Sequence, residues 1–210
     1  MSRTDDLVIH VVDDDAAFRR SLVFLLESVG WRVESHASAE DFLAVHPQSS
    51  ADLGCLVLDI RMPTMSGLEL QQALHARGAR TPIVFITGHG DVELAVQAMK
   101  HGASDFLQKP FRDQALLDAV GAAVRRGAQE RAQGALRDGA LALLGRLSPR
   151  EREVARLVAQ GLPNKLVARE LDISEKTVHV HRQHIMEKVE VGSAAELARV
   201  MLRADPTTLD

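Results

Sequence analysis

The sequence predicts an α/β fold with a doubly wound, five-stranded parallel sheet, followed by a helical linker and an all-α helix-turn-helix domain of four helices. Three apolar runs in the front half are nearly continuous, as expected for strands covered on both faces: residues 7–12, 55–58 and 82–86. Helical patterns separate these runs, whereas residues 148–203 carry helical patterns alone. We therefore expect two domains.

Two weaker strand candidates, residues 31–35 and 104–107, complete the predicted sheet. Apolar residues at helical spacing predict a helix after three of the strands: Phe18, Leu22, Leu25 and Val29; Leu68, Leu70 and Leu74; and Val92, Ala95, Val96 and Met99. In a sheet of this kind the ligand site lies beyond the carboxyl ends of the strands.

The composition argues against several classes of protein. No apolar run approaches the roughly 20 residues of a membrane-spanning helix, and the acidic residues near the start are unlike a secretory signal, so a cytoplasmic location is expected. The single cysteine, Cys55, excludes an internal disulfide. Residues 1–125 carry 11 basic and 17 acidic residues, against 10 and 8 in residues 148–203, which suggests separate roles.

Polar side chains follow four of the predicted strands. Asp13 and Asp14 follow the first, Asp59 the third, Thr87 the fourth and Lys109 the fifth. Carboxylates gathered in one crevice repel one another unless a divalent cation lies among them, and Mg²⁺ suits such oxygen ligands. The set predicts an aspartyl-phosphate site in which Asp59 attacks phosphorus, Lys109 neutralises the developing charge and Thr87 donates to the product.

Each of these residues also has an ordinary structural interpretation. An acidic pair at a strand end commonly caps a turn or a helix. Lys109 alone would be a solvated surface lysine, and Thr87 alone would cap a helix near residues 89–91. Their arrangement at the ends of successive strands favours the phosphate site.

The front half resembles the receiver domain of bacterial response regulators, which has a flavodoxin-like fold. The segments that carry the resemblance are residues 11–14, 57–63, 65, 67, 70, 87–88, 103–106 and 109–111. Residues 86–91 resemble in particular the FixJ and TodT-like subgroup of this family. The resemblance implies that Asp59 is the phosphoacceptor and that a sensor histidine kinase is the donor.

The same resemblance implies further roles. Mg²⁺ would be bound by Asp14, Asp59 and the backbone carbonyl of Arg61, with Asp13 completing the acidic pair. Phe106 would be an aromatic switch, with plain core packing as the alternative, and the peptide bond before Pro110 would be cis.

Residues 125–146 form the predicted linker. A helix starting near residue 111 is expected to weaken along it, because each interior glycine costs a helix about 1 kcal/mol. Leu136, Leu143 and Leu144 either pair with a second copy of the chain or fold back onto one of the domains.

The C-terminal segment begins with a strong helix start at Ser148 and Pro149. Residues 164–171 and 174–189 follow as two helices separated by a tight turn. On the longer helix, the apolar residues form an inward stripe of Val178, Ile185, Met186 and Val189.

The opposite face of that helix is the candidate DNA-binding surface. Val180 would touch a thymine methyl, while His179 and Gln183 reach base edges. Lys165 and Lys176 would meet phosphates, and Arg182 serves either a phosphate or its own domain. The alternative is a solvated face of mixed polarity. His179, His181 and His184 do not share one face, so no metal site is expected there.

The C-terminal segment resembles the LuxR/GerE-type DNA-binding domain. The resemblance is carried by residues 150–154, 161, 164–165, 168, 171, 173–174, 177–178, 180–182 and 185–188, and includes Thr177 among the DNA-binding residues. It implies a dimer formed through residues 194–202. Two departures are Asp172, where the family usually has glycine, and Pro163, which supplies no capping hydroxyl.

Together these observations predict a transcriptional response regulator with a receiver domain at residues 5–124, a linker at 125–146 and a DNA-binding domain at 147–204. Phosphorylation of Asp59 would produce a homodimer that binds double-stranded promoter DNA, engages RNA polymerase and activates transcription. Its own chemistry would be limited to Mg²⁺-dependent self-phosphotransfer and slow autodephosphorylation. The alternatives are a Mg²⁺-dependent phosphohydrolase and a constitutive DNA-binding protein.

Overall fold

The computed structural model of the chain describes residues 7–46, 53–88 and 92–208. The chain divides into two compact units, residues 1–130 and residues 131–210. No helix in the described ranges has both the length and the apolar character that crossing a membrane requires.

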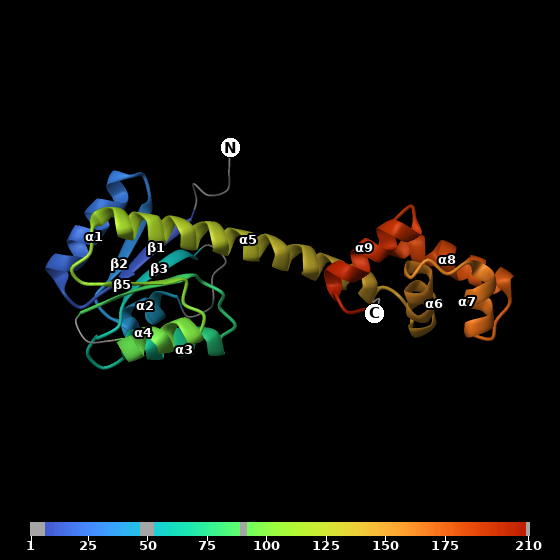
Figure 1. Cartoon of the computed structure of the whole chain (residues 1–210), viewed down its shortest axis with the longest axis horizontal. Coiled ribbons are helices and arrows are strands. Elements are labelled where there is room, and N and C mark those ends of the chain that lie inside the picture. Colours follow the sequence, from blue (N-terminus) through green and yellow to red (C-terminus); the bar gives the residue numbers. More distant parts are fainter. Residues whose placement is uncertain (1–6, 47–52, 89–91, 209–210) are drawn as a thin grey trace. The chain divides into compact units, whose positions relative to one another are not determined.

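The first unit is built on a five-stranded parallel sheet in the order β2-β1-β3-β4-β5, which confirms the predicted fold class (Figure 1). Its strands are β1 (Val8–Val12), β2 (Arg32–His36), β3 (Leu53–Asp59), β4 (Ile83–Thr87) and β5 (Asp105–Gln108). The three central strands are almost wholly buried, as their continuous apolar runs predicted, whereas the two edge strands keep exposed residues.

Helices cover both faces of this sheet. The unit contains α1 (Ala16–Ser28), α2 (Ala39–Val45), α3 (Gly67–Ala76), α4 (Val92–Lys100) and the first part of α5 (Asp113–Gly145). One hydrophobic core joins α1 and α5 to one face, and a second joins α2, α3 and α4 to the other. Phe42, Leu56 and Phe85 are fully buried in the second core.

Two of the predicted helix faces need correction. Val29 is 53% exposed and caps the end of α1, because Leu26 is the residue of this last turn that faces the sheet. On α4, Val96 and Met99 are 48% and 46% exposed, because the helix presents Ala98 to the core instead. The side chain of Val92 lies outside the described residues.

The expected weakening of the linker helix is also wrong. α5 runs without interruption for 33 residues. Good helix-forming residues dominate its sequence, and both of its ends are packed: Leu116 and Val120 in the first unit, Ala140 in the second. Leu143 and Leu144 fold back onto the core of the second unit, as one of the two alternatives predicted. Leu136 is 55% exposed.

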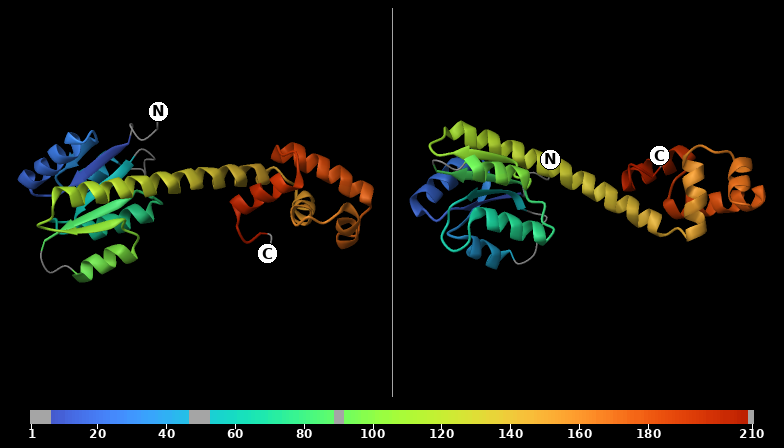
Figure 2. Two further views of the ribbon diagram at one scale, coloured as in Figure 1. Left: turned by 45° about the horizontal axis from the view of Figure 1, so that its top comes forward. Right: turned by 60° about the horizontal axis from the view of Figure 1, so that its bottom comes forward.

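The second unit is a bundle of four further helices, shown from two other directions in Figure 2. They are α6 (Pro149–Ala159), α7 (Asn164–Glu170), α8 (Glu175–Val189) and α9 (Ala194–Ala204). Ser148 caps α6 in a reciprocal capping box with Glu151, which confirms the predicted helix start. The inward stripe of α8 is also confirmed, because Val178, Ile185 and Val189 are buried.

The two departures from the family pattern are accommodated locally. Asp172, in the turn between α7 and α8, has a left-handed φ of 51°, a conformation that aspartate tolerates better than most residues. Pro163 stands at the N-cap of α7 and makes no side-chain capping hydrogen bond.

Candidate functional site

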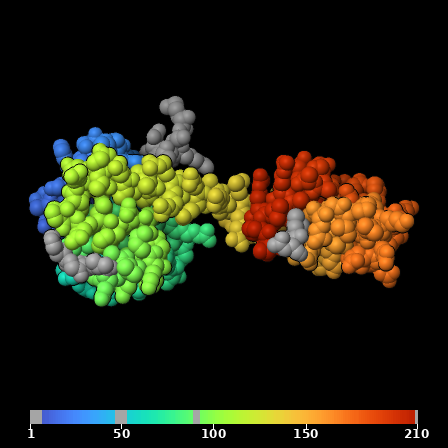
Figure 3. Space-filling view, viewed as in Figure 1, coloured from blue at the N-terminus to red at the C-terminus, as the bar shows by residue number. Residues whose placement is uncertain are grey.

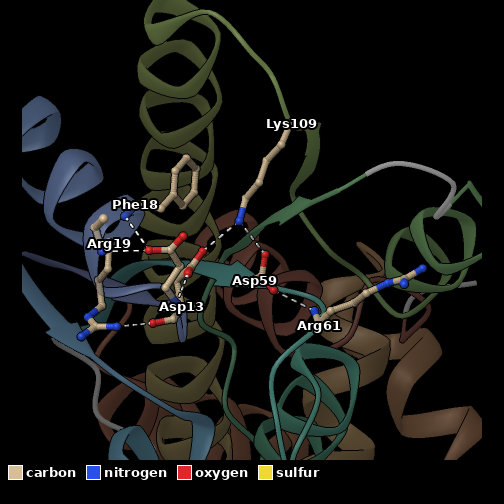
Figure 4. A network of polar contacts seen from close by, with 8 residues as sticks. Asp13, Phe18, Arg19, Asp59, Arg61 and Lys109 are labelled. Atoms are coloured by element: carbon tan, nitrogen blue, oxygen red, sulfur yellow. Dashed lines mark hydrogen bonds and ion pairs between the residues drawn. The ribbon is translucent and has the colours of Figure 1, made fainter.

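The carboxyl ends of the strands bring Asp13, Asp59 and Lys109 into direct contact (Figure 4). Asp13 follows β1, Asp59 ends β3, and Lys109 follows β5. The ammonium Nζ of Lys109 lies 3.1 Å from Oδ2 of Asp13 and 2.9 Å from Oδ1 of Asp59. One lysine therefore bridges two carboxylates separated by 46 positions in the sequence.

Backbone groups orient both carboxylates. The amide of Asp15 donates to Oδ1 of Asp13 at 2.8 Å, and the amide of Arg61 donates to Oδ2 of Asp59 at 2.8 Å. Each carboxylate thus uses one oxygen for the loop that carries it and the other for Lys109. Gly67 begins α3 against this loop, where a Cβ atom would overlap the carbonyl oxygen of Asp59.

Burial and charge shape the protonation of the site. Asp13 and Asp59 are only 2% and 7% exposed. Burial raises the pKa of Asp59, although the hydrogen bond from Lys109 opposes that effect and Asp13 reinforces it. Burial alone would lower the pKa of Lys109, but its hydrogen bonds to Asp59 and Asp13 outweigh burial and raise it. Lys109 is therefore a permanent positive charge in the crevice.

These residues fit a Mg²⁺ ion. Two buried carboxylates share one ammonium, so negative charge remains to be neutralised, and the exposed Asp14 adds a further carboxylate next to Asp13. Mg²⁺ prefers such oxygen ligands, binds through one or two carboxylates and keeps several waters. Arg61 lies two residues after Asp59, in the loop that follows β3, and its amide binds the Asp59 carboxylate.

Thr87 and Phe106 lie on the neighbouring strands β4 and β5. Thr87 ends β4 with 1% of its surface exposed, and its carbonyl oxygen accepts a hydrogen bond of 2.7 Å from the amide of Lys109. The peptide bond between Lys109 and Pro110 is cis, as the resemblance implied. Phe106 pairs in register with Phe85 and packs, half-buried, against the core that includes α4. Residues 89–91 lie outside the described residues.

Sequence reasoning missed two supporting side chains at this site, both on α1. The Nζ atom of Lys109 lies 4.0 Å from the centroid of the Phe18 ring, a cation–π contact that steers the lysine toward the carboxylates (Figure 4). Arg19 donates from its guanidinium to the carbonyl oxygen of Asp13 at 2.5 Å. Phe18 and Arg19 lie in the first turn of α1, directly after the acidic residues, and this position was a signal for a role at the site. Helical spacing of the apolar residues had instead assigned Phe18 to core packing alone.

In the second unit, the residues predicted to bind DNA lie mainly on the solvent side of α8. Lys176, Thr177, His179, Val180 and Gln183 are all exposed there, and Lys165 is exposed on α7. Val180 is 42% exposed, although the same helix has a buried apolar stripe. Thr177 also contacts the N-cap, with its Oγ1 atom 2.8 Å from Oγ of Ser174.

Arg182 differs from the other candidates. Its guanidinium donates to Oδ1 of Asn164 at 3.1 Å, and the side chain is half-buried. This contact joins α8 to the start of α7, so Arg182 serves its own domain in this structure.

Comparisons with known proteins agree with this arrangement. The receiver domain of response regulators matches residues 9–121, and the luxR family of bacterial regulatory proteins matches residues 145–201. The transcriptional regulatory protein FixJ of Azorhizobium caulinodans is 47% identical over 206 residues, which cover 98% of this chain and 97% of that protein. The response regulator protein TodT of Pseudomonas putida is 45% identical over 196 residues, covering 93% and 86%.

Two solved structures extend the similarity to the fold. The response regulator StyR matches with a TM-score of 0.80 and 44% identity, covering 93% of this chain and 98% of that one. Full-length FixJ from B. japonicum matches with a TM-score of 0.59 and 45% identity, covering 94% and 96%.

Proposed function

Because this chain belongs to the response regulators that join a receiver domain to a luxR-type DNA-binding domain, we propose that phosphorylation of Asp59 controls its binding to promoter DNA. It is a two-component DNA-binding regulator and not a classical enzyme. In the proposal, residues 5–124 act as receiver, 125–146 as linker and 147–204 as DNA-binding domain. Its working location is the cytoplasm, where promoter DNA is found.

The observation that carries the proposal is the double contact of Lys109 with Asp13 and Asp59. An Oδ atom of Asp59 forms a bond to phosphorus as the bond from phosphorus to the kinase histidine breaks, and that histidine nitrogen keeps the electron pair. Lys109 neutralises charge on the phosphoryl oxygens, and the Thr87 hydroxyl donates to the product. The same site supports self-phosphotransfer from small donors and slow autodephosphorylation.

Mg²⁺ would be held by Asp13, Asp14, Asp59 and the backbone carbonyl of Arg61. When bound, it supplies positive charge for the phosphoryl oxygens and balances the carboxylates. Lys109 remains the protein's own cation at the site, since its pKa is raised.

Phosphorylation is proposed to act through Phe106 and α4. Once Thr87 turns toward the phosphoryl group, the half-buried Phe106 ring repacks against the core beside α4. Val96 and Met99 are exposed on that helix, so it offers apolar surface to a second copy. α4, β5 and the start of α5 form the green part of the face in Figure 3. Phosphorylation would shift the population toward a homodimer.

DNA binding is assigned to the exposed face of α8 and the start of α7. Lys165, Lys176 and Thr177 would contact phosphates, while His179, Val180 and Gln183 contact base edges in the major groove. Arg182 would hold α8 against Asn164 or turn to a phosphate on binding. Two copies double these contacts, which suits a dimer on paired half-sites. The proposed result is recruitment of RNA polymerase and activation of transcription.

The test is intact mass and size-exclusion chromatography after incubation with Mg²⁺ and a small phosphodonor. We expect one phosphate and a larger species for the wild type, and neither for Asp59→Asn. Asp138→Asn, an exposed aspartate of α5, is the matched control and should behave as the wild type. Phosphate on the Asp59→Asn variant would contradict the assignment, and continuous turnover of the donor would favour a phosphohydrolase instead.

A further inference from the structure

Three histidines that the phosphorylation site does not use gather on the α2 side of the sheet. His10 lies on β1, His36 ends β2, and His46 caps the end of α2. In the parallel register His10 stands opposite Glu34, and His36 lies two residues farther along β2. The two strands lie side by side in Figure 1, so neighbouring strand positions and a helix end converge on one point.

The ligand atoms of this group are already close together. Nδ1 of His10 lies 3.3 Å from Nε2 of His36 and 3.7 Å from Oε2 of Glu34. One atom from each of the four side chains can be chosen so that all lie within 4.8 Å of one another. With Zn–N bonds of about 2.05 Å, two ligands of a tetrahedral ion are about 3.3 Å apart. The His10–His36 pair therefore has the spacing of two ligands on one ion.

Two histidines of the cluster are buried and share a hydrogen bond, while one nitrogen of the third has no partner. His10 is 2% exposed and His36 is 8% exposed. The fully buried Phe42 ring packs against all three histidines, with centroid distances of 5.6, 5.2 and 4.8 Å to His10, His36 and His46. Nε2 of His46 is buried without a hydrogen-bond partner in the described structure. An unsatisfied buried nitrogen requires an explanation, and a metal ligand supplies one.

Burial affects the pKa of two of these histidines. Burial, reinforced by repulsion from His46 and His36, lowers the pKa of His10 to about 3. Burial also lowers the pKa of His36.

We infer that the receiver domain contains a second metal site, selective for Zn²⁺ or a similar transition-metal ion, formed by the side chains of His10, Glu34, His36 and His46. Imidazole nitrogens select such ions over Mg²⁺, which prefers oxygen ligands. The site is distinct from the carboxylate crevice. It is also linked to it, because the amide of Asp13 donates to the carbonyl oxygen of His36 at 3.4 Å. A bound ion would tie β1, β2 and α2 together next to the acidic pair.

The test uses the full chain, freed of metal by a chelator and then supplied with excess Mg²⁺ to occupy the carboxylate crevice. Co²⁺ is titrated as the probe, because tetrahedral Co²⁺ absorbs strongly in the visible range. We expect one Co²⁺ per chain with tetrahedral absorption, displaced by Zn²⁺. His46→Gln should weaken binding at least about 10-fold. Equal affinity in the wild type and His46→Gln, or absent tetrahedral absorption, would overturn the proposal.

Two controls separate this site from other histidines. His101→Gln changes an exposed histidine after α4, and His75→Gln changes one on α3. Both should bind Co²⁺ as the wild type does, whereas loss of binding in either would overturn the assignment. Circular dichroism of each variant checks its fold. Glu34→Gln alters an exposed ligand, so it weakens binding with little risk to folding.

A second readout does not depend on any variant. Zn²⁺ bound only to the folded state raises the temperature of unfolding. Trp31, the only tryptophan, precedes β2 and reports unfolding of this domain by fluorescence. X-ray absorption of the Zn²⁺ complex should detect three imidazole ligands, and a spectrum with one or none would contradict the site.

Discussion

Lys188 of α8 donates hydrogen bonds from Nζ to both carboxylate oxygens of Glu151, at 2.8 and 2.7 Å. Glu151 is 4% exposed and also accepts from the amide of Ser148 at the N-cap of α6. This pair joins the candidate DNA-binding helix to the first turn of α6. It therefore contributes to holding α8 in its domain.

The Glu151–Lys188 pair predicts a dependence of stability on acid. Hydrogen bonds that Glu151 accepts from Lys188 and Ser148 lower its pKa from 4.5 to about 2. The unfolded chain therefore binds more protons between these values, so the stabilisation is complete above pH 4.5 and is lost as the pH falls toward 2. His184 also lies near this carboxylate, with Nδ1 4.0 Å from Oε1 of Glu151.

Glu151→Gln tests this prediction. At neutral pH we expect it to lower the free energy of unfolding of the C-terminal domain by about 2 kcal/mol, because the hydrogen bonds from Lys188 to a charged acceptor are lost. The difference from the wild type should shrink as the pH falls from 4.5 toward 2. Thermal unfolding followed by circular dichroism measures it, with the exposed Glu153→Gln as control. A difference independent of pH would contradict the role given to this carboxylate.

Lys109→Gln should slow phosphorylation of Asp59 by about 100-fold, because a charge-stabilising group is removed from the reacting oxygens. Two buried carboxylates would also face each other without their shared ammonium. Phosphate incorporation over time, from a small donor with Mg²⁺, measures the rate. Lys100→Gln, at the exposed end of α4, should leave the rate unchanged. A normal rate in Lys109→Gln would remove the lysine from the proposed mechanism.

Gly67→Ala should displace the loop that carries Asp59, because the added methyl overlaps the Asp59 carbonyl oxygen. We expect destabilisation by about 1–3 kcal/mol and slower phosphorylation. Gly139→Ala is the contrasting variant, since nothing lies near its Cβ position in α5. It should stabilise the helix by up to about 1 kcal/mol. The stability of Gly67→Ala is measured by urea denaturation followed by Trp31 fluorescence. The stability of Gly139→Ala is measured by urea denaturation followed by circular dichroism. Equal stability of the two variants would mean that the loop accepts the methyl without strain, contrary to this prediction.

Lys176→Gln should weaken binding to any duplex DNA and lower the salt-dependence slope by about 0.9 per copy, because one phosphate contact is lost. Val180→Ala should leave that slope unchanged and relax the base preference at one position of each half-site. Fluorescence anisotropy at several salt concentrations measures the salt-dependence slope of DNA binding. Selection from a random duplex library measures the base preference at each position. The exposed Arg152→Gln of α6 serves as control. A changed slope for Val180→Ala would contradict its assignment to a base.

Much of the fold followed from local patterns. Continuous apolar runs predicted the buried central strands, and helical spacing predicted α1, α3 and the stripe on α8. The same reasoning failed for Val96 and Met99, because several faces of α4 are apolar and only packing against the sheet selects Ala98. It failed for α5, because propensity alone does not include the packing at both helix ends.

The sequence by itself determined that the candidate site residues meet, because parallel strands bring their carboxyl ends together whatever the details of packing. Asp13, Asp59 and Lys109 could be predicted to meet from their strand ends alone. Only the tertiary structure decided which partners side chains take across the fold. It paired Arg182 with Asn164, and it gathered His10, His36 and His46 around Phe42. These contacts depend on the pairing of separate strands and on helix docking, which bring together residues far apart in the sequence.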